Sequence, residues 1–86
     1  MTYILPDDVT AAQSEHGLVL LDQRNGRYWQ LNKTGAATLS LLLDGYSPAA
    51  AAARLTRDFP DASERAQSDV TALVETLEKA GLLEKA

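Results

Sequence analysis

The pattern of apolar and polar residues is clearest between residues 18 and 31, where two runs of strand character flank Asn25-Gly26. Residues 18–22 form an apolar run, and residues 27–31 carry Tyr28 and Trp29. An Asn-Gly pair supplies the positive φ angles that a tight hairpin turn requires. The pattern therefore predicts one β-hairpin, and we expect the rest of the chain to be arranged around it.

The pairing within this hairpin determines which side chains share a face. With a loop of either two or four residues, one face carries Leu18, Leu20, Trp29 and Leu31, and the other carries Val19, Leu21, Tyr28 and Gln30. The first strand is apolar on both faces, which is typical of a strand that is covered on both sides. The second strand contains Arg27 and Gln30, and we expect it at the edge of a sheet.

Two weaker segments precede the hairpin. Residues 3–6 end in Pro6, which lacks a backbone donor, so we expect an irregular arm. Residues 9–13 fit a first strand, and residues 14–17 fit a turn. His16 in this turn could titrate near neutral pH, but no second metal ligand or nucleophile accompanies it, and a solvated turn residue is the expected role.

Two helices are predicted after the hairpin. Asn32 stands at an N-cap position, and residues 33–44 repeat apolar side chains at three- and four-residue spacing until Gly45. Ser47-Pro48 begins the second helix, with proline at the first helical position, where its missing donor has no cost. Phe59-Pro60 ends this helix, because the residue before a proline avoids the α region.

The third and longest helix is expected over residues 62–80. Asp61 and Glu64 have the spacing of a capping box, with Ser63 between them, and they would open the helix. Gly81 would end it in a Schellman motif, in which Leu82 packs back on the last turn. The apolar stripe between these ends is Ala66, Val70, Leu73, Val74, Leu77 and Ala80.

This order of elements predicts a single domain over residues 1–86 of the α+β class, a three-stranded antiparallel sheet followed by three helices that cover one of its faces. The order of the helices is also that of a winged helix-turn-helix, so a DNA-binding regulator is one alternative. The charge of the third helix argues against it. Against Arg65 and Lys79, this helix carries four carboxylates, Glu64, Asp69, Glu75 and Glu78.

The composition excludes further classes of function. The 86 residues are 45% hydrophobic and 23% charged, with a net charge of −4 and no cysteine. This charge argues against unspecific binding to nucleic acid or anionic membranes. No apolar run is long enough to span a bilayer, and no signal peptide is evident, so we expect a cytoplasmic location. The lack of cysteine excludes disulfides, thiolate metal sites and a cysteine nucleophile.

No group of residues has the pattern of a catalytic site. Each carboxylate can be explained as a turn residue, a helix cap or a solvated residue. The sequence has neither the nucleophile elbow of a serine hydrolase nor a phosphate-binding glycine loop. Tyr28 and Trp29 could stack on a base or a flat cofactor, but an aromatic pair on a small sheet is more often core. We therefore predict no enzyme, no cofactor and no metal, and we expect an interaction module that uses the edge strand.

Four segments together carry a resemblance to a known family. Residues 17–22 (GLVLLD), 26–32 (GRYWQLN), 41–45 (LLLDG) and 77–83 (LEKAGLL) closely resemble the PqqD-like family. These are leader-peptide-binding domains, also called RiPP recognition elements, and the resemblance extends from about residue 9 to residue 83. A free-standing acidic domain of this length is most similar to the branch of lasso-peptide biosynthesis. A peptide chaperone of the pyrroloquinoline-quinone pathway has nearly the same motifs and stays an alternative.

The resemblance implies that the chain binds the leader of a ribosomal precursor peptide as an added β-strand. In the family, the peptide lies between the third strand and the third helix, which are residues 27–31 and 62–80 here. The implied peptide-binding residues are Arg27, Tyr28, Trp29, Gln30, Leu31, Ala66, Asp69, Val70, Leu73, Val74 and Leu77. Leu73 and Leu77 fit the core as well as they fit a groove, and Asp69 either meets a basic leader residue or is solvated.

The resemblance also implies the partners. Lasso leaders in this family typically carry a Tyr…Pro…Leu pattern, which would supply apolar anchors. The domain would not cut the peptide but would deliver the leader to a separate cysteine protease, the leader peptidase, before a cyclase closes the ring. This fits a chain that has no cysteine. We expect neither nucleic acid nor a membrane as a partner.

Overall fold

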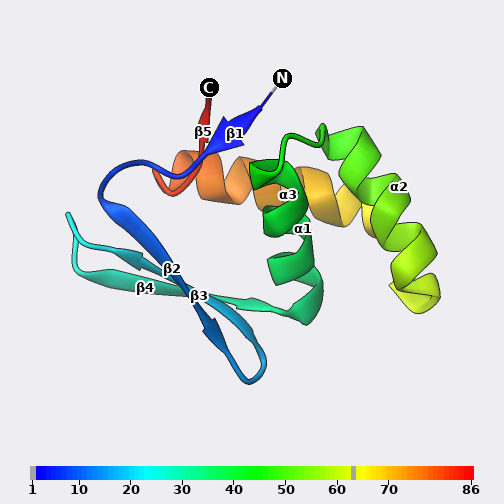
Figure 1. Ribbon diagram of the computed structural model, residues 1–86, viewed down its shortest axis with the longest axis horizontal. Coiled ribbons are helices and arrows are strands. Elements are labelled where there is room, and N and C mark those ends of the chain that lie inside the picture. The colour runs from blue at the N-terminus through cyan, green and yellow to red at the C-terminus, as the bar shows by residue number, and fades with distance from the viewer. Residues whose placement is uncertain (1, 63) are drawn as a thin grey trace.

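The fold is known from a computed structural model, which describes residues 2–62 and 64–86. Figure 1 shows a sheet on one side and the helices on the other. The elements are β1 (Tyr3–Ile4), β2 (Val9–Ser14), β3 (Gly17–Asp22), β4 (Arg27–Asn32), α1 (Lys33–Leu43), α2 (Pro48–Asp58), the 3-10 helix η1 (Pro60–Ala62), α3 (Ala66–Lys79) and β5 (Glu84–Lys85). The predicted α+β class, with a three-stranded antiparallel sheet followed by three α-helices, is confirmed.

The main sheet has the strand order β2-β3-β4, so β4 lies at an edge, as predicted. The register of the hairpin is also confirmed, since Leu18 pairs with Leu31 and Leu20 pairs with Trp29. Leu20 is fully buried, and Trp29 is partly buried and packs against the core. These residues face α1, which packs on β3 and β4. The inner face of the hairpin is thereby part of the core.

The outer face of the same sheet has no such cover. Val19 and Leu21 of β3 are only half-buried, and Tyr28 of β4 is 75% exposed. The expectation that the first hairpin strand is covered on both sides is therefore wrong. The reason is visible in Figure 1, where α1, α2 and α3 all lie on one side of the three-stranded sheet.

The ends of the helices follow the capping chemistry of the sequence. The Asn32 side chain accepts from the N–H of Gly35 at 2.8 Å, and the Ser47 hydroxyl accepts from the N–H of Ala50 at 3.1 Å. At the end of α3, the N–H of Leu82 donates to the carbonyl of Leu77 at 2.8 Å, and Gly81 has φ +76°. This is the predicted Schellman motif, and it buries Leu82 completely.

The start of α3 differs from the prediction. The helix begins at Ala66, its N-cap residue is Arg65, and no side chain caps it. The predicted capping box of Asp61 and Glu64 does not open the helix, because Asp61 belongs to η1 and Glu64 precedes Arg65. Ser63 of the predicted box lies outside the described residues. The helix starts with the first residue of its buried stripe, since Ala66 is 3% exposed.

The two ends of the chain form a second small sheet. β1 and β5 are antiparallel, with Tyr3 opposite Lys85 and Ile4 opposite Glu84. Tyr3 is 3% exposed and belongs to the core cluster. The N-terminal segment is therefore not the irregular arm that the sequence suggested, because its backbone is paired with residues at least 80 positions away.

Candidate functional site

The candidate site begins with the free edge of β4, which has no strand neighbour other than β3 among the residues that the structure describes. Two bonds determine which backbone groups point outward. The N–H of Gly26 donates to the carbonyl of Asp22 on the β4 side, and the N–H of Gln23 donates to the carbonyl of Asp8 on the β2 side, both at 2.8 Å. Successive residues of a strand direct their N–H and C=O groups to opposite sides.

This alternation identifies the unpaired backbone groups. Asp22 faces β4, and its register partner Arg27 therefore faces β3. Tyr28 and Gln30 then direct their N–H and C=O groups away from β3, toward the open side of the sheet. Tyr28 and Gln30 thus offer two donors and two acceptors to this edge, at the spacing of a β-ladder.

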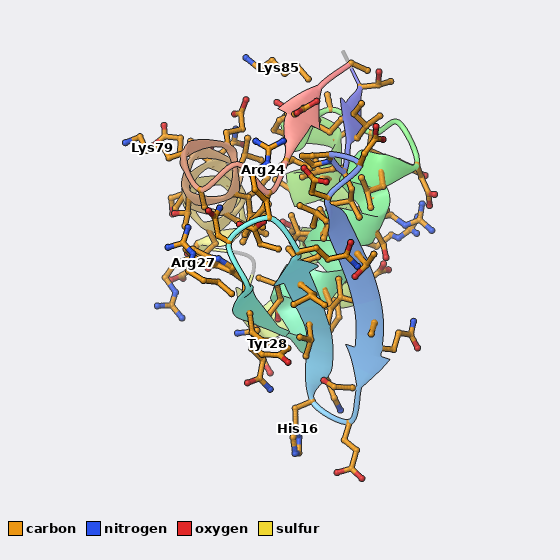
Figure 2. All side chains as sticks on the ribbon, turned by 90° about the vertical axis from the view of Figure 1, so that its left-hand side faces the viewer. His16, Arg24, Arg27, Tyr28, Lys79 and Lys85 are labelled. Atoms are coloured by element: carbon orange, nitrogen blue, oxygen red, sulfur yellow. The ribbon has the colours of Figure 1, made fainter. Side chains whose placement is uncertain are left out.

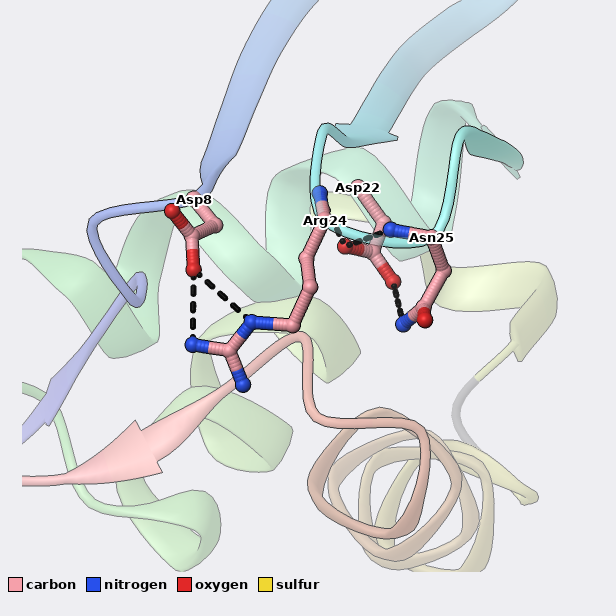
Figure 3. A network of polar contacts seen from close by, with 4 residues as sticks. All are labelled: Asp8, Asp22, Arg24 and Asn25. Atoms are coloured by element: carbon pink, nitrogen blue, oxygen red, sulfur yellow. Dashed lines mark hydrogen bonds and ion pairs between the residues drawn. The ribbon is translucent and has the colours of Figure 1, made fainter.

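A polar network fixes the loop from which β4 begins (Figure 3). Asp22 is only 4% exposed. Its carboxylate accepts from the Asn25 side-chain amide at 2.7 Å, and from the backbone N–H groups of Arg24 at 3.1 Å and Asn25 at 3.3 Å. These bonds lower the pKa of Asp22 below its ordinary value of 3.8, and the bond from the Asn25 side chain has the largest effect. Burial acts in the opposite direction and raises this pKa. Arg24 in turn forms an ion pair with Asp8 at 2.7 Å.

The second wall of the site is the exposed side of α3. A pocket of about 400 Å³ lies between the N-terminal half of α3 and the segment where β4 passes into α1. From α3 it is lined by Ala66, Asp69, Ala72, Leu73 and Thr76. From the other side it is lined by Asn32, Thr34, Gly35 and Thr38, and Leu55 of α2 contributes to it. The small side chains of α3 leave room above an apolar floor.

The opposite ends of β4 and α3 are also close to each other. A smaller pocket of about 150 Å³ brings Arg24 and Asn25, just before β4, next to Ala80 and Gly81, just after α3. β4 and α3 therefore run in opposite directions along the same side of the molecule. Figure 2 looks onto this side, where Arg27 of β4 and Lys79 of α3 both project outward. We call the space between β4 and α3, including the 400 Å³ pocket, the β4–α3 groove.

The predicted site residues fall into three groups. The structure brings Ala66, Asp69 and Leu73 together in the 400 Å³ pocket. It places Arg27, Trp29 and Leu31 on the inner face of β4, and Tyr28 and Gln30 on its outer face. It buries Val70, Val74 and Leu77 in the core, at 1%, 6% and 1% exposure. Leu73 is partly buried and lies between these roles, since it packs against the core and lines the pocket.

Reasoning from the sequence missed the contribution of the end of β4 and the start of α1. Asn32, Thr34, Gly35 and Thr38 line the pocket, although the sequence suggested only a helix cap in this segment. Thr38 is buried, and its hydroxyl donates to the carbonyl of Thr34 at 2.8 Å. The spacing of four residues between these threonines places them on one side of α1, and this was the available signal.

The described residues show neither a metal-binding nor a membrane-spanning element. In residues 2–62 and 64–86, no three His, Cys, Asp or Glu side chains are grouped so that they could hold a metal ion. Over the same ranges, no helix is long and apolar enough to cross a bilayer. The groove therefore offers backbone pairing, apolar contact, the carboxylate of Asp69 and the polar side chains of Asn32, Thr34, Thr38 and Thr76.

Comparison with known proteins gives concordant results. The sequence matches the PqqD family, described as coenzyme PQQ synthesis protein D, over residues 17–83. The structure "Lasso peptide synthetase B1 complexed with the leader peptide" is 40% identical, has a TM-score of 0.88, and is matched over 99% of this chain and 100% of that chain. The structure "TbiB1 in Complex with the TbiA(beta) Leader Peptide" shares the fold at 24% identity, with a TM-score of 0.82 over 100% of this chain and 98% of that chain. No curated protein matches the chain significantly. Because the family match covers most of the sequence, the chain belongs to the PqqD family.

Proposed function

We propose that this protein binds the leader of a ribosomal precursor peptide, of the lasso-peptide type, as an additional strand on β4. The observation that carries the proposal is the free edge of β4 beside an open pocket of about 400 Å³ on α3. The match to a lasso peptide synthetase B1 in complex with a leader peptide, at 40% identity over 99% of this chain, supports the same conclusion.

The backbone of the leader would pair with Tyr28 and Gln30. These residues direct one donor and one acceptor each to the open edge, which fixes the path of a strand without reading its sequence. Selectivity would come from leader side chains that point into the β4–α3 groove. Ala66, Asp69 and Leu73 are the predicted site residues with surface in the pocket, whereas Val70, Val74 and Leu77 would act from beneath as its packed support.

The expected affinity follows from burying a few anchors. Each apolar anchor that the pocket covers contributes about 1.5–3 kcal/mol. Ordering a disordered leader offsets part of this gain, about 2–5 kcal/mol in coupled folding and binding. Three well-buried anchors at the upper end of this range, with four edge bonds at about 1 kcal/mol each, reach about −8 kcal/mol, which corresponds to a micromolar dissociation constant.

The same proposal assigns no catalysis to this chain. The sequence contains no cysteine, so the nucleophile of a cysteine leader peptidase has to come from another chain. We propose that the domain delivers the bound leader to such a separate protease, and that it works in the cytoplasm. Delivery would be tested by adding the protease to precursor with and without this protein.

A titration with a matched pair of proline variants tests strand addition. Gln30→Pro removes an outward N–H from the edge of β4, and Gln13→Pro removes one from the opposite edge, where Gln13 pairs with Leu18. Fluorescence anisotropy would follow a labelled lasso leader at physiological salt, beside an equally labelled duplex DNA. One lost backbone bond is worth about 1 kcal/mol, and the proline ring also obstructs the edge, so we expect at least about a tenfold loss for Gln30→Pro only.

Three results would contradict the proposal. Folded Gln30→Pro protein that binds the leader as tightly as the wild type would argue against pairing on β4. An equal loss in Gln13→Pro would indicate a general effect on the sheet. Tight, salt-sensitive binding of the duplex without binding of the leader would favour the DNA-binding alternative.

A further inference from the structure

Tyr28 has an unusual position for an aromatic residue of this small domain. It is 75% exposed and lies on the outer face of the sheet, in the strand with the free edge. Figure 2 shows it projecting from the sheet into solvent. We propose that Tyr28 recognises an outward-facing side chain of the bound leader, so that the peptide is read on both of its faces. This inference rests on the proposed strand addition to β4.

The register of the sheet defines the row to which Tyr28 belongs. Thr10 pairs with Leu21, and Leu21 pairs with Tyr28, so the three residues form one row across β2, β3 and β4 on the outer face. Leu21 is half-buried, which is consistent with contact from both neighbours in the row. A strand added to β4 extends this row by one position, directly beside the Tyr28 ring.

The alternation of a β-strand makes this contact unavoidable. Side chains of the leader point in turn toward the groove and toward the outer face. The backbone of Tyr28 points to the added strand, so the residue opposite it shares its face, and the distance between the two Cα atoms is about 5.5 Å in an antiparallel pair. The residues that fill the groove therefore cannot be the ones that contact Tyr28.

The chemistry of the row indicates which leader residue fits. Directly opposite residues on one face interact, and aromatic residues pair best with aromatic or β-branched partners. The neighbouring outer row consists of Ala12, Val19 and Gln30, and its edge residue is polar. We expect an aromatic or β-branched leader residue opposite Tyr28 and weaker selection opposite Gln30.

A coupling experiment tests this assignment. A fluorescein-labelled synthetic leader of a lasso precursor and its single-alanine variants are titrated against wild-type protein, Tyr28→Ala, Leu73→Ala and the control Thr10→Ala. Thr10 occupies the same row at the opposite edge. Because Tyr28 is mostly exposed, the substitution should leave the fold intact, which circular dichroism would check.

The expected result is a position-specific loss. One leader position should lose about two- to fivefold in affinity when it becomes alanine, the range of a cross-strand pair, and Tyr28→Ala should abolish this sensitivity. That position should lie an odd number of residues from the positions whose effect depends on Leu73, because the two sets face opposite sides. Thr10→Ala should leave every leader variant unchanged.

Other outcomes would overturn the inference. Tyr28→Ala that weakens all leader variants alike, or none, shows that no single leader side chain contacts this ring. A coupled position at an even spacing from the groove positions contradicts the placement of Tyr28 on the outer face of the complex. In each case binding by wild-type protein keeps the proposed function intact, whereas no binding of any leader by the wild type overturns both.

Discussion

The division of the α3 stripe into core and groove can be tested with two substitutions, Val70→Ala and Leu73→Ala. Val70 is 1% exposed, so its two lost methyl groups, at about 0.8 kcal/mol each plus a small cavity, should destabilise the protein by about 2 kcal/mol. In a domain of this size, this lowers the melting temperature by about 10 °C. The pocket wall does not include Val70, so folded Val70→Ala protein should bind the leader normally.

Leu73→Ala should cost less stability than Val70→Ala but more affinity for the leader. Its side chain is only partly buried in the free protein, so Leu73→Ala should destabilise the fold by about 1 kcal/mol. The part of the side chain that lines the pocket would be covered by the leader, and its loss should weaken binding by about 1 kcal/mol, which is a fivefold change in dissociation constant. Val70→Ala should therefore be the more damaging variant in the stability assay, and Leu73→Ala the more damaging variant in the binding assay.

The assay combines urea denaturation with anisotropy titration of the same samples at 25 °C, where both variants remain folded. Urea midpoints give the loss in free energy of unfolding, and the titrations give the dissociation constants. If Val70→Ala weakened binding as much as Leu73→Ala, or if Leu73→Ala left the affinity unchanged, the assignment of Leu73 to the groove would be refuted.

Three further predictions address charge, pH and backbone. Asp69→Asn should weaken the binding of a leader with a basic residue by about two- to fivefold at low salt and have no effect at 0.5 M salt. An equal effect at both salt concentrations in anisotropy titrations would exclude an ion pair. The pKa of Asp22 is lowered in the folded protein, so the stability that this carboxylate contributes is present above pH 3.8 and is lost as the pH falls below that value. The urea midpoint of Asp22→Asn should therefore approach that of the wild type between pH 4 and pH 2, and a constant difference between the two would contradict this linkage. Gly17→Ala should destabilise the protein far more than Gly26→Ala, because a Cβ at Gly17 would overlap the carbonyl oxygen of Leu31. A Cβ at Gly26 meets nothing within 4 Å, so only its φ of +66° imposes a penalty, of about 1 kcal/mol, and similar melting temperatures for the two variants would disprove this prediction.

The main sheet could be predicted from the sequence because its signals are local. Asn25-Gly26 identifies the turn, and a period of two residues determines which side chains share a face. The caps at Asn32, Ser47 and Gly81 have the same local character, and the structure confirms all three. Local chemistry failed at Asp61, where the capping spacing is present but the buried stripe begins only at Ala66.

The other differences depend on contacts that are distant in sequence. β1 and β5 have two residues each, which is too short for any periodicity, so their pairing becomes visible only in three dimensions. The candidate site was predictable where it follows the alternation of β4 and the stripe of α3. At Thr34 and Thr38 the spacing shows only that the two side chains share one side of α1, because the sequence does not show that this side lies opposite α3.

The small β1–β5 sheet has a consequence for how this domain can be combined with others. Because Tyr3–Ile4 and Glu84–Lys85 are paired, both ends of the chain leave the molecule at one place, as Figure 1 shows. An additional domain joined to either end would be anchored at this same point, outside the sheet that contains β4. A further domain could therefore be connected at either end while the edge of β4 keeps its unpaired backbone groups.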